Sequence, residues 1–384
     1  MTTSTSKISI IGTGFVADLY MRSLETFPHI QLLKVYDINP ARLAAFSNFW
    51  NVKAAKSLED VLAVNASNEE EKPDLILNLT NPGAHFGVSK ACLDANINVY
   101  SEKPLATKME DAYALYELAK YKGLVLTSAP CSYLSEVAQT LWCAVRQNIV
   151  GRPLLVYAEL DDDFITQAPY QKWISESGAP WPFRDEFLVG CTLEHAGYYL
   201  TWLMMIFGSV KKVIAASAEL VKNKLPDLPE SAPDYSTASL FFENGMVARL
   251  TCGIVAPHNH SLRIYGEQGT LEVDESWNNS AKVKVRKRYV IRRKLINSPF
   301  TKRFKLTGPT HPKVPRRGAA AMNFALGPAE VLAALADGRD KTYLADFALH
   351  LNEVTLAIQN ALDTEGVQIM RTKCPEIKPM NWAK

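Results

Sequence analysis

The 384-residue sequence lacks several features that define particular classes of protein. Its six cysteines are scattered and include no Cys-x-x-Cys pair, which favours reduced thiols in a cytosol over a disulfide framework. The most apolar window, 198–207, is too short to cross a bilayer and predicts a buried helix. The net charge is only +2, so composition gives no reason to expect nucleic acid or a membrane as partner. The polar N-terminal segment has no signal-peptide core, and we therefore expect a cytoplasmic enzyme.

What the sequence does have is the composition of a globular protein, 47% hydrophobic and 21% charged. At roughly 150 residues per domain, this length predicts two or three domains. The first third alternates strands and helices, a pattern typical of a doubly wound parallel sheet, and we assign 1–127 to such a domain. Strands are predicted at 7–11, 31–36, 52–55, 74–79, 96–100 and 124–127, helices at 58–64 and 109–122, and a solvated polar loop at 65–72.

A glycine-rich turn follows the first of these strands. The segment 12–17 has the pattern Gly-x-Gly-x-x-Ala between a strand and a helix, as in dinucleotide-binding domains. Gly12 permits the tight turn, Gly14 lets the backbone approach a pyrophosphate, and Ala17 lets the helix pack close to the strand. The helix N-terminus attracts the phosphates. We therefore expect cofactor contacts along the turn, from Gly12, Thr13, Gly14, Phe15 and Val16.

The choice of cofactor depends on Asp37, at the end of the second strand. A carboxylate a little over twenty residues after the glycines can accept hydrogen bonds from an adenosine ribose, and it disfavours a ribose phosphate. NAD is therefore preferred over NADP. Arg42, one turn into the next helix, leaves NADP as the alternative cofactor because an arginine can bind the ribose phosphate.

Lys103 stands at the carboxyl end of the strand predicted at 96–100, between Glu102 and Pro104. Proline biases the residue before it towards an extended conformation, so Lys103 is presented on a restrained backbone. Ligands bind at this edge of an open α/β sheet. The loop 80–85 follows the neighbouring strand and would border the nicotinamide, with His85 as either a cofactor contact or a helix-start residue.

From about residue 128 the chain changes to strands with longer connections, predicted at 154–160, 213–220, 237–242, 246–252, 261–265 and 269–273. Asn244-Gly245 indicates a hairpin. We assign 128–384 to an α+β domain with a large, mostly antiparallel open sheet that binds substrate and forms the oligomer. The basic segment 282–305 alternates in its first part, and we interpret it as an exposed, solvated β-ribbon. Attraction of an anionic substrate or of a neighbouring subunit is the alternative.

The sequence resembles the Gfo/Idh/MocA oxidoreductases, which are NAD(P)-dependent enzymes acting mostly on sugars, cyclitols and their derivatives. The likeness covers nearly the whole chain. It rests on the Gly12-Thr13-Gly14 turn, Asp37, the Thr80-Asn81-Pro82 loop with His85, and above all Glu102-Lys103-Pro104. The resemblance implies cofactor contacts at these positions, Glu102 and Lys103 included. It also implies a homodimer or homotetramer formed through the second-domain sheet.

The same resemblance singles out the segment 190–199, where the family usually carries Asp-x-Gly-x-His. Aligned on Gly197, this chain has His195 at the acidic position and Tyr199 at the histidine position. Removing a hydride from an alcohol also requires a base for the hydroxyl proton and a cation for the developing alkoxide. Lys103 can supply the cation, and either His195 or Tyr199 can carry the proton. Glu194 would orient His195 or bind substrate hydroxyls.

Further substrate contacts are expected from Trp173 and Arg184, since aromatic faces stack on sugar rings and arginine binds hydroxyls or phosphates. Asp161-Asp162-Asp163 is interpreted as a solvated turn near the cleft. His258 and His260 would share one face of a strand, but no third ligand is evident, and we expect no metal.

Together these features predict an NAD-dependent oxidoreductase of a secondary alcohol or ketone on a sugar, cyclitol or sugar derivative. Two alternatives remain open: a ketoreductase of a nucleotide-linked sugar, and a non-catalytic dinucleotide-binding regulator of the same fold. A reductase of a planar, non-sugar substrate is also compatible with the altered residue at 195. The sequence determines neither the substrate nor the carbon oxidised nor the physiological direction.

Overall fold

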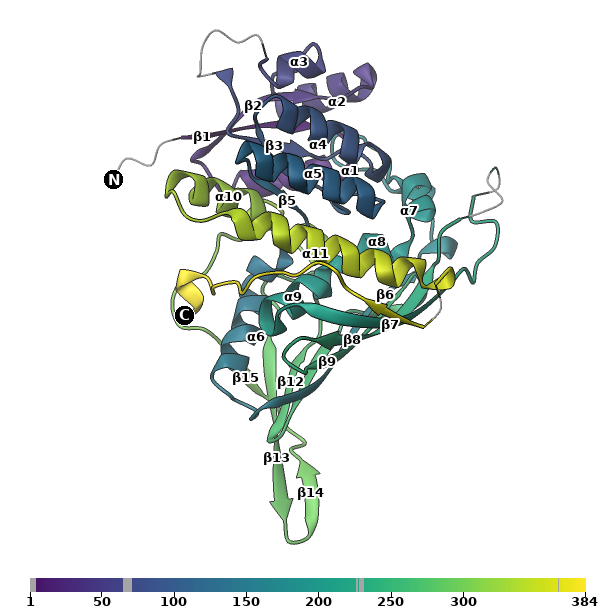
Figure 1. Ribbon diagram of the computed structural model, residues 1–384, viewed down its shortest axis with the longest axis vertical. Helices are drawn as coiled ribbons and strands as arrows, with labels where there is room; N and C mark the ends of the chain where they lie inside the picture. The colour runs from purple at the N-terminus through teal and green to yellow at the C-terminus, as the bar shows by residue number, and fades with distance from the viewer. Residues whose placement is uncertain (1–4, 65–70, 226, 228–230, 365) are drawn as a thin grey trace. The chain divides into compact units, whose positions relative to one another are not determined.

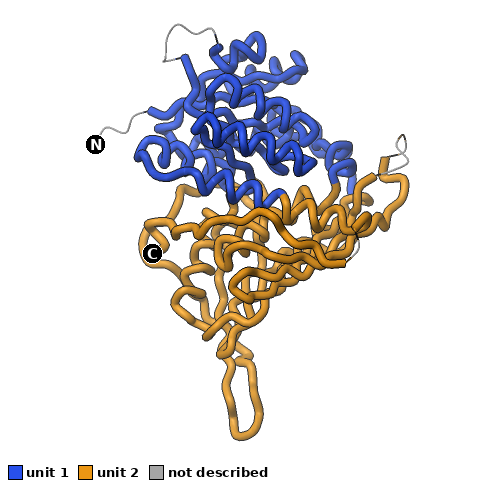
Figure 2. Tube along the Cα trace, viewed as in Figure 1, with its two compact units in different colours: residues 1–130, 168–189, 323–352 blue, residues 131–167, 190–322, 353–384 orange. Residues whose placement is uncertain are grey.

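The computed structural model describes residues 5–64, 71–225, 227, 231–364 and 366–384. The chain divides into two compact units, and each is described here by itself (Figure 2). Unit 1 comprises Met1–Pro130, Ala168–Val189 and Asn323–Asn352. Unit 2 comprises Cys131–Gln167, Gly190–Met322 and Glu353–Lys384. The predicted polar loop at 65–72 falls largely on residues outside the described part of the chain.

Unit 1 is built on a parallel five-stranded sheet with the strand order β2-β1-β3-β4-β5, which confirms the predicted Rossmann fold (Figure 1). The strands are short and their central residues are fully buried, as expected for strands covered on both faces. The elements are β1 (Ser6–Ile11), α1 (Phe15–Leu24), β2 (Ile30–Tyr36), α2 (Pro40–Trp50), α3 (Leu58–Val61), β3 (Leu75–Asn78), α4 (His85–Asp94), β4 (Asn98–Ser101), α5 (Met109–Lys122) and β5 (Leu126–Ser128).

Two later segments of the chain complete unit 1, whereas the sequence predicts one boundary after residue 127. The first contains α7 (Phe183–Val189), and the second contains α10 (Leu326–Ala336) and the first part of α11 (Thr342–Gln359). Specific packing holds the second segment: Gly327 of α10 lies so close to Tyr100 of β4 that an added Cβ would be 2.5 Å from the tyrosine ring. Ala106 donates a backbone hydrogen bond of 3.1 Å to the Asn352 side chain.

Unit 2 contains an eleven-stranded sheet whose main order is β14-β13-β12-β11-β6-β9-β8-β7-β16. Strand β10 pairs with β6 and β15 with β13. Every pair is antiparallel except β6 with β9, as predicted for this domain. The strands are β6 (Pro153–Phe164), β7 (Val210–Ala218), β8 (Tyr235–Phe242), β9 (Val247–Gly253), β10 (Val255–Asn259), β11 (Leu262–Gly266), β12 (Gly269–Val273), β13 (Val283–Ile291), β14 (Lys294–Asn297), β15 (Lys302–Phe304) and β16 (Val367–Ile369).

Helices α6 (Glu136–Arg146), α8 (Cys191–His195) and α9 (Gly197–Phe207) lie along one side of this sheet (Figure 1). Alternation explains why the strands present an apolar face to them: every second residue of β8 is buried, from Ser236 to Phe242. Helix α9 is the apolar helix that the sequence predicts, and it is buried almost throughout. The basic segment forms the β13–β14 hairpin, which extends away from the rest of unit 2 (Figure 1).

The differences from the predicted elements are local. The strand expected at 52–55 is a single β-bridge between Ala54 and Val35. Strands β10 and β16 are absent from the prediction; β10 reads Val-Ala-Pro-His-Asn, in which proline and histidine obscure a strand pattern. Among the described residues, one stretch, Gly318–Ala336, is long and apolar enough to cross a membrane. Half of its most apolar part is buried inside the structure.

Gly327 generates a prediction about stability. Replacing Gly327 with alanine places a Cβ against the buried ring of Tyr100, and overpacking of this kind costs about 1–3 kcal/mol. The matched control is Gly87→Ala in α4, where no atom lies within 4 Å of the new Cβ and a gain of up to about 1 kcal/mol is expected. Denaturant unfolding of both variants provides the measurement. Equal stabilities would contradict the close contact between α10 and β4.

Candidate cofactor and catalytic sites

The turn after β1 has the geometry that a pyrophosphate requires. Gly12 has a φ of +95°, and a Cβ there would lie 2.5 Å from the carbonyl carbon of Leu79, so only glycine fits. Gly14 differs, because no atom lies within 4 Å of its absent Cβ and the space beside it is open. Helix α1 begins at Phe15 with no side-chain cap, which leaves its first N–H groups to a ligand. Ala17 is fully buried against the strand, as the motif predicts.

Asp37 at the end of β2 is hydrogen-bonded to this turn. Its Oδ2 accepts hydrogen bonds from the Thr13 backbone N–H at 2.7 Å and from the Thr13 hydroxyl at 2.9 Å. Its Oδ1 accepts from the backbone of Asn39, the residue that caps α2. The acidic residue and the glycine turn are therefore one hydrogen-bonded structure. Ile38, next to Asp37, is 90% exposed and offers an apolar surface for an adenine.

The guanidinium of Arg42 binds protein carbonyls. Its Nε and one terminal nitrogen donate to the Thr13 carbonyl, at 3.3 and 2.7 Å. Its other contacts are the Ser177 carbonyl at 3.0 Å and the Ser177 hydroxyl at 2.9 Å. This arrangement commits the arginine to holding the turn, a role that sequence reasoning did not assign.

Sequence reasoning also missed Asp18 and Ser177. Asp18 lies on α1, is 1% exposed, and accepts two hydrogen bonds of 2.9 Å from the backbone and hydroxyl of Ser177. Its other oxygen accepts from the Trp50 indole at 2.6 Å. The segment that begins at Ala168 is thereby attached to the phosphate-binding helix. A buried acid in the first turn of that helix is the only sequence signal that could have indicated it.

The predicted Thr80-Asn81-Pro82 loop is shaped by a buried asparagine that the sequence analysis did not select. The Asn78 amide oxygen accepts from the Thr80 hydroxyl at 2.7 Å, and its NH₂ donates to the His85 carbonyl and the Ser89 hydroxyl. His85 is fully buried at the start of α4, and its ring nitrogens lie 2.7 Å from the Pro104 carbonyl and 2.9 Å from the Thr80 carbonyl. The histidine thus connects this loop to the lysine turn.

Lys103 follows β4 at the carboxyl edge of the parallel sheet, where the sequence predicts it. Its backbone N–H donates to Glu102 Oε2 at 3.1 Å, and the other oxygen of Glu102 accepts from the Tyr20 hydroxyl at 2.7 Å. The backbone N–H of Glu102 donates to the Asn78 carbonyl at 2.8 Å. The lysine backbone is therefore fixed to α1 and β3 while its side chain is partly exposed.

Within unit 2, His195 at the end of α8 is next to a carboxylate. Its Nε2 lies 3.7 Å from Asp162 Oδ2, and the side chains are 12% and 15% exposed. The ring also contacts Trp277, with 5.8 Å between ring centres. An imidazole that lies beside a carboxylate and packs against an aromatic ring can hold and release a proton. Asp162, which the sequence analysis placed in a solvated turn, is thus a mostly buried partner of three histidines.

Tyr199 on α9 has a different environment. It is fully buried, and its hydroxyl donates to the His260 carbonyl at 2.5 Å. Burial raises the pKa of this phenol well above its ordinary value, and nearby Glu275 adds to the shift. These observations favour a structural role for Tyr199.

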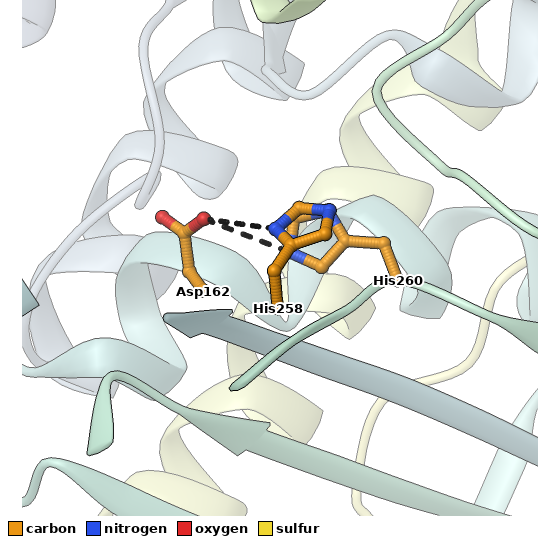
Figure 3. A group of neighbouring side chains, drawn as sticks. All are labelled: Asp162, His258 and His260. Atoms are coloured by element: carbon orange, nitrogen blue, oxygen red, sulfur yellow. Dashed lines mark ion pairs between the residues drawn. The ribbon is translucent and has the colours of Figure 1, made fainter. Parts of the chain in front are cut away.

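His258 and His260 lie beside Asp162 as well (Figure 3). The nitrogens His258 Nδ1 and His260 Nε2 are 3.7 and 3.8 Å from Asp162 Oδ1. Glu275 lies on the other side and contacts the remaining nitrogen of each ring, at 2.9 and 3.0 Å.

The other residues that are predicted to contact substrate belong to different units. Trp173 and Arg184 belong to unit 1, where Trp173 packs edge-on against Trp181 with ring centres 5.1 Å apart and Arg184 is exposed on α7. Glu194 belongs to unit 2 and is 4% exposed on α8.

The open glycine turn, its uncapped helix and the acid after β2 together define a dinucleotide-binding domain of the Rossmann type. Residues 6–129 match the model of the oxidoreductase family with an NAD-binding Rossmann fold, and residues 138–272 match the GFO/IDH/MocA C-terminal domain. The chain belongs to the Gfo/Idh/MocA family of oxidoreductases.

Known proteins similar to this chain are distant in sequence. An uncharacterised oxidoreductase of Synechocystis sp. is 25% identical over 281 residues, which cover 69% of this chain and 70% of the relative. The NADP-dependent scyllo-inositol 2-dehydrogenase of Bacillus subtilis is 21% identical over 55% of this chain and 54% of its own. A structure of the WlbA dehydrogenase from Chromobacterium violaceum with NADH and UDP-GlcNAcA has a TM-score of 0.70 and 20% identity, over 98% and 97% of the chains. At this identity the structural likeness shows the fold alone.

Proposed function

We propose that this oxidoreductase transfers a hydride between nicotinamide and a secondary alcohol or ketone of a sugar, cyclitol or sugar derivative. The observation that carries the proposal is the fixed backbone of Lys103 at the carboxyl edge of a sheet whose glycine turn is open to a dinucleotide. Family membership supports it, as does the inositol dehydrogenase among the relatives.

The residues present fit a dinucleotide. The open space at Gly14 admits a pyrophosphate, and Thr13, Phe15 and Val16 lie in the turn that would bind it. Asp37 would accept a hydrogen bond from a ribose hydroxyl, and the loop of Thr80, Asn81 and Pro82, beside β3, would border the nicotinamide. The bound cofactor supplies the hydride chemistry.

Lys103 is proposed to orient and polarise the reacting oxygen. Its ammonium supplies positive charge where an alkoxide develops, and electrostatic stabilisation acts best when the cation is held in place before reaction. Here the adjacent carboxylate of Glu102 is already occupied by Tyr20 and the Lys103 backbone. The backbone that carries the lysine is therefore fixed, and we propose its ammonium as the cation.

His195 is proposed as the proton carrier in preference to Tyr199. Both were open from the sequence, and their surroundings distinguish them. The Tyr199 phenol is buried, with a raised pKa and a hydrogen bond to a backbone carbonyl, so it releases its proton poorly. His195 retains a slightly exposed imidazole beside Asp162, which stabilises the protonated ring. Buried Glu194 remains proposed to orient the neighbouring His195 or to bind substrate hydroxyls, and Trp173 and Arg184 remain proposed substrate contacts.

We propose NAD as the preferred cofactor. Asp37 would repel a ribose 2′-phosphate, and Arg42, the residue that kept NADP open, already donates to Thr13 and Ser177. A nucleotide-linked sugar is the second candidate substrate, because a structural neighbour was solved with UDP-GlcNAcA and NADH.

A homo-oligomer in the cytoplasm is part of the proposal. The β13–β14 hairpin exposes apolar side chains that a second copy would cover: Val290 is 73% and Leu295 67% exposed. They lie on either side of the basic turn Arg292-Arg293-Lys294, which gives the hairpin an apolar and a basic component.

Lys103→Ala should lower turnover by at least 100-fold, because the reacting oxygen loses its cation, while NADH affinity changes little. The control is Lys108→Ala, an exposed lysine on the same loop. Turnover is followed by NADH absorbance over a panel of sugars, cyclitols and nucleotide sugars, and affinity by NADH fluorescence. If Lys103→Ala keeps full turnover, the lysine has no part in the reaction.

His195→Ala should reduce kcat by 10²–10⁴-fold, the usual contribution of a positioned acid or base. Tyr199→Phe removes one buried hydrogen bond and should cost about 1 kcal/mol of stability with little effect on kcat. Steady-state kinetics and denaturant unfolding of both variants separate the two roles. The opposite pattern would assign the proton to Tyr199.

Asp37→Ala should narrow the preference for NADH over NADPH, because it removes the charge that repels the 2′-phosphate. It also removes the acceptor of two Thr13 hydrogen bonds, so weaker NADH binding is expected as well. Titrations of wild type and variant with both cofactors measure the effect. Equal affinities of the wild type for NADH and NADPH would refute the preference.

A further inference from the structure

We propose that Asp162, His258 and His260 form a binding site for a divalent transition-metal ion of the Zn²⁺ class. The site lies within unit 2 (Figure 3) and does not rest on the proposed hydride chemistry. Sequence analysis selected the two histidines but found no third ligand. The structure supplies one from a strand almost one hundred residues earlier.

Strand pairing explains how the three side chains come together. β10 runs antiparallel to the end of β6, with Asn259 opposite Asp161. His258 and His260 flank Asn259, so they alternate past it on one face, and Asp162 follows Asp161. The ligand set is therefore fixed by backbone hydrogen bonds.

The distances suit a shared ion better than direct contacts. Asp162 Oδ1 is 3.7 Å from His258 Nδ1 and 3.8 Å from His260 Nε2, which is too long for a hydrogen bond. The three ligand atoms lie within 4.8 Å of one another. Each ligand lies ~2.1 Å from a bound zinc, so two ligands on one ion are about 3–4 Å apart. Small side-chain movements complete the coordination.

Glu275 supplies the outer support that histidine ligands need. Its Oε2 lies 2.9 Å from His258 Nε2, and its Oε1 lies 3.0 Å from His260 Nδ1. Glu275 Oε1 also accepts a hydrogen bond of 2.9 Å from the Trp277 backbone N–H, which helps to hold the carboxylate in place. With their outer nitrogens on Glu275, the rings face Asp162 with His258 Nδ1 and His260 Nε2. A carboxylate on the outer nitrogen of a histidine ligand orients the ring towards the metal ion.

His260 provides an independent observation. Its side chain is fully buried, and its Nε2 has no hydrogen-bond partner among the described residues. A buried polar nitrogen without a hydrogen-bond partner is unfavourable, and a cation bound between it and Asp162 would satisfy both groups. The unsatisfied nitrogen points into the space shared with Asp162 and His258 (Figure 3).

The donor set indicates the kind of ion and its accessibility. Two imidazoles and one carboxylate favour zinc and its neighbours over calcium or magnesium, which prefer oxygen ligands. Three protein ligands leave a position for water or for an oxygen of a bound molecule. The His258 side chain is 44% exposed, so the ion can reach the site. His195 contacts Asp162 through the other oxygen, Oδ2, and is not a ligand.

The test is metal binding by the full-length protein after treatment with a chelator. We expect one equivalent of Zn²⁺ by calorimetry and a visible d–d spectrum with Co²⁺. His258→Ala and Asp162→Asn should each weaken Zn²⁺ binding by at least 100-fold, and Glu275→Gln by 10–100-fold as an outer-support change. His29→Ala, an exposed histidine in unit 1, is the matched control and should bind as wild type does.

Circular dichroism shows whether each variant is folded, and His258→Ala is the decisive one because its side chain is partly exposed. Absence of stoichiometric binding by the wild type would overturn the proposal and leave the group as an ion-pair cluster. Binding that survives His258→Ala in a folded protein would place the ion elsewhere and overturn it as well. Neither outcome depends on enzymatic turnover.

Discussion

The dinucleotide half of this protein depends on the buried carboxylate of Glu102. One of its oxygens accepts from the Tyr20 hydroxyl on α1, the other from the backbone of Lys103, and its own N–H donates to the carbonyl of Asn78. A carboxylate that is 6% exposed persists only because its lone pairs are occupied. The carboxylate thereby joins α1 to the lysine turn, and the backbone of the same residue joins that turn to the end of β3. Removing the Glu102 side chain would release α1 and the lysine turn from each other.

In unit 2, the carboxylate of Asp162 likewise joins residues from different elements. One of its oxygens faces His195 and the other faces His258 and His260, while Glu275 holds the far side of the latter pair. Burial raises the pKa of Asp162, and the charges of His260 and His258 oppose that rise. The carboxylate therefore couples α8 to β10. His195 at the end of α8 thus faces an aspartate contributed by strand β6.

Local patterns explain what could be predicted from the sequence. Helix α5 and strand β12 have the predicted bounds, since each is a regular apolar pattern that ends in a turn. The glycine turn and the position of Lys103 at the end of β4 could be predicted because each depends on a few adjacent residues. Other residues act through contacts with parts of the chain 15 to 159 positions away. Ser177 supports the phosphate-binding helix in this way, and Asp162 and Glu275 contact the histidines in this way. No local pattern contains such contacts.

The discontinuous course of the chain has a consequence for how the protein is made. Unit 1 draws on residues as late as Asn352, so its helix α10 reaches Tyr100 only after most of the chain has left the ribosome. During synthesis, part of the apolar surface of the N-terminal sheet therefore stays exposed until α10 has been made. Much of unit 2 is available to fold before that point. A fragment that ends near residue 130 would keep that surface uncovered and would be prone to aggregate.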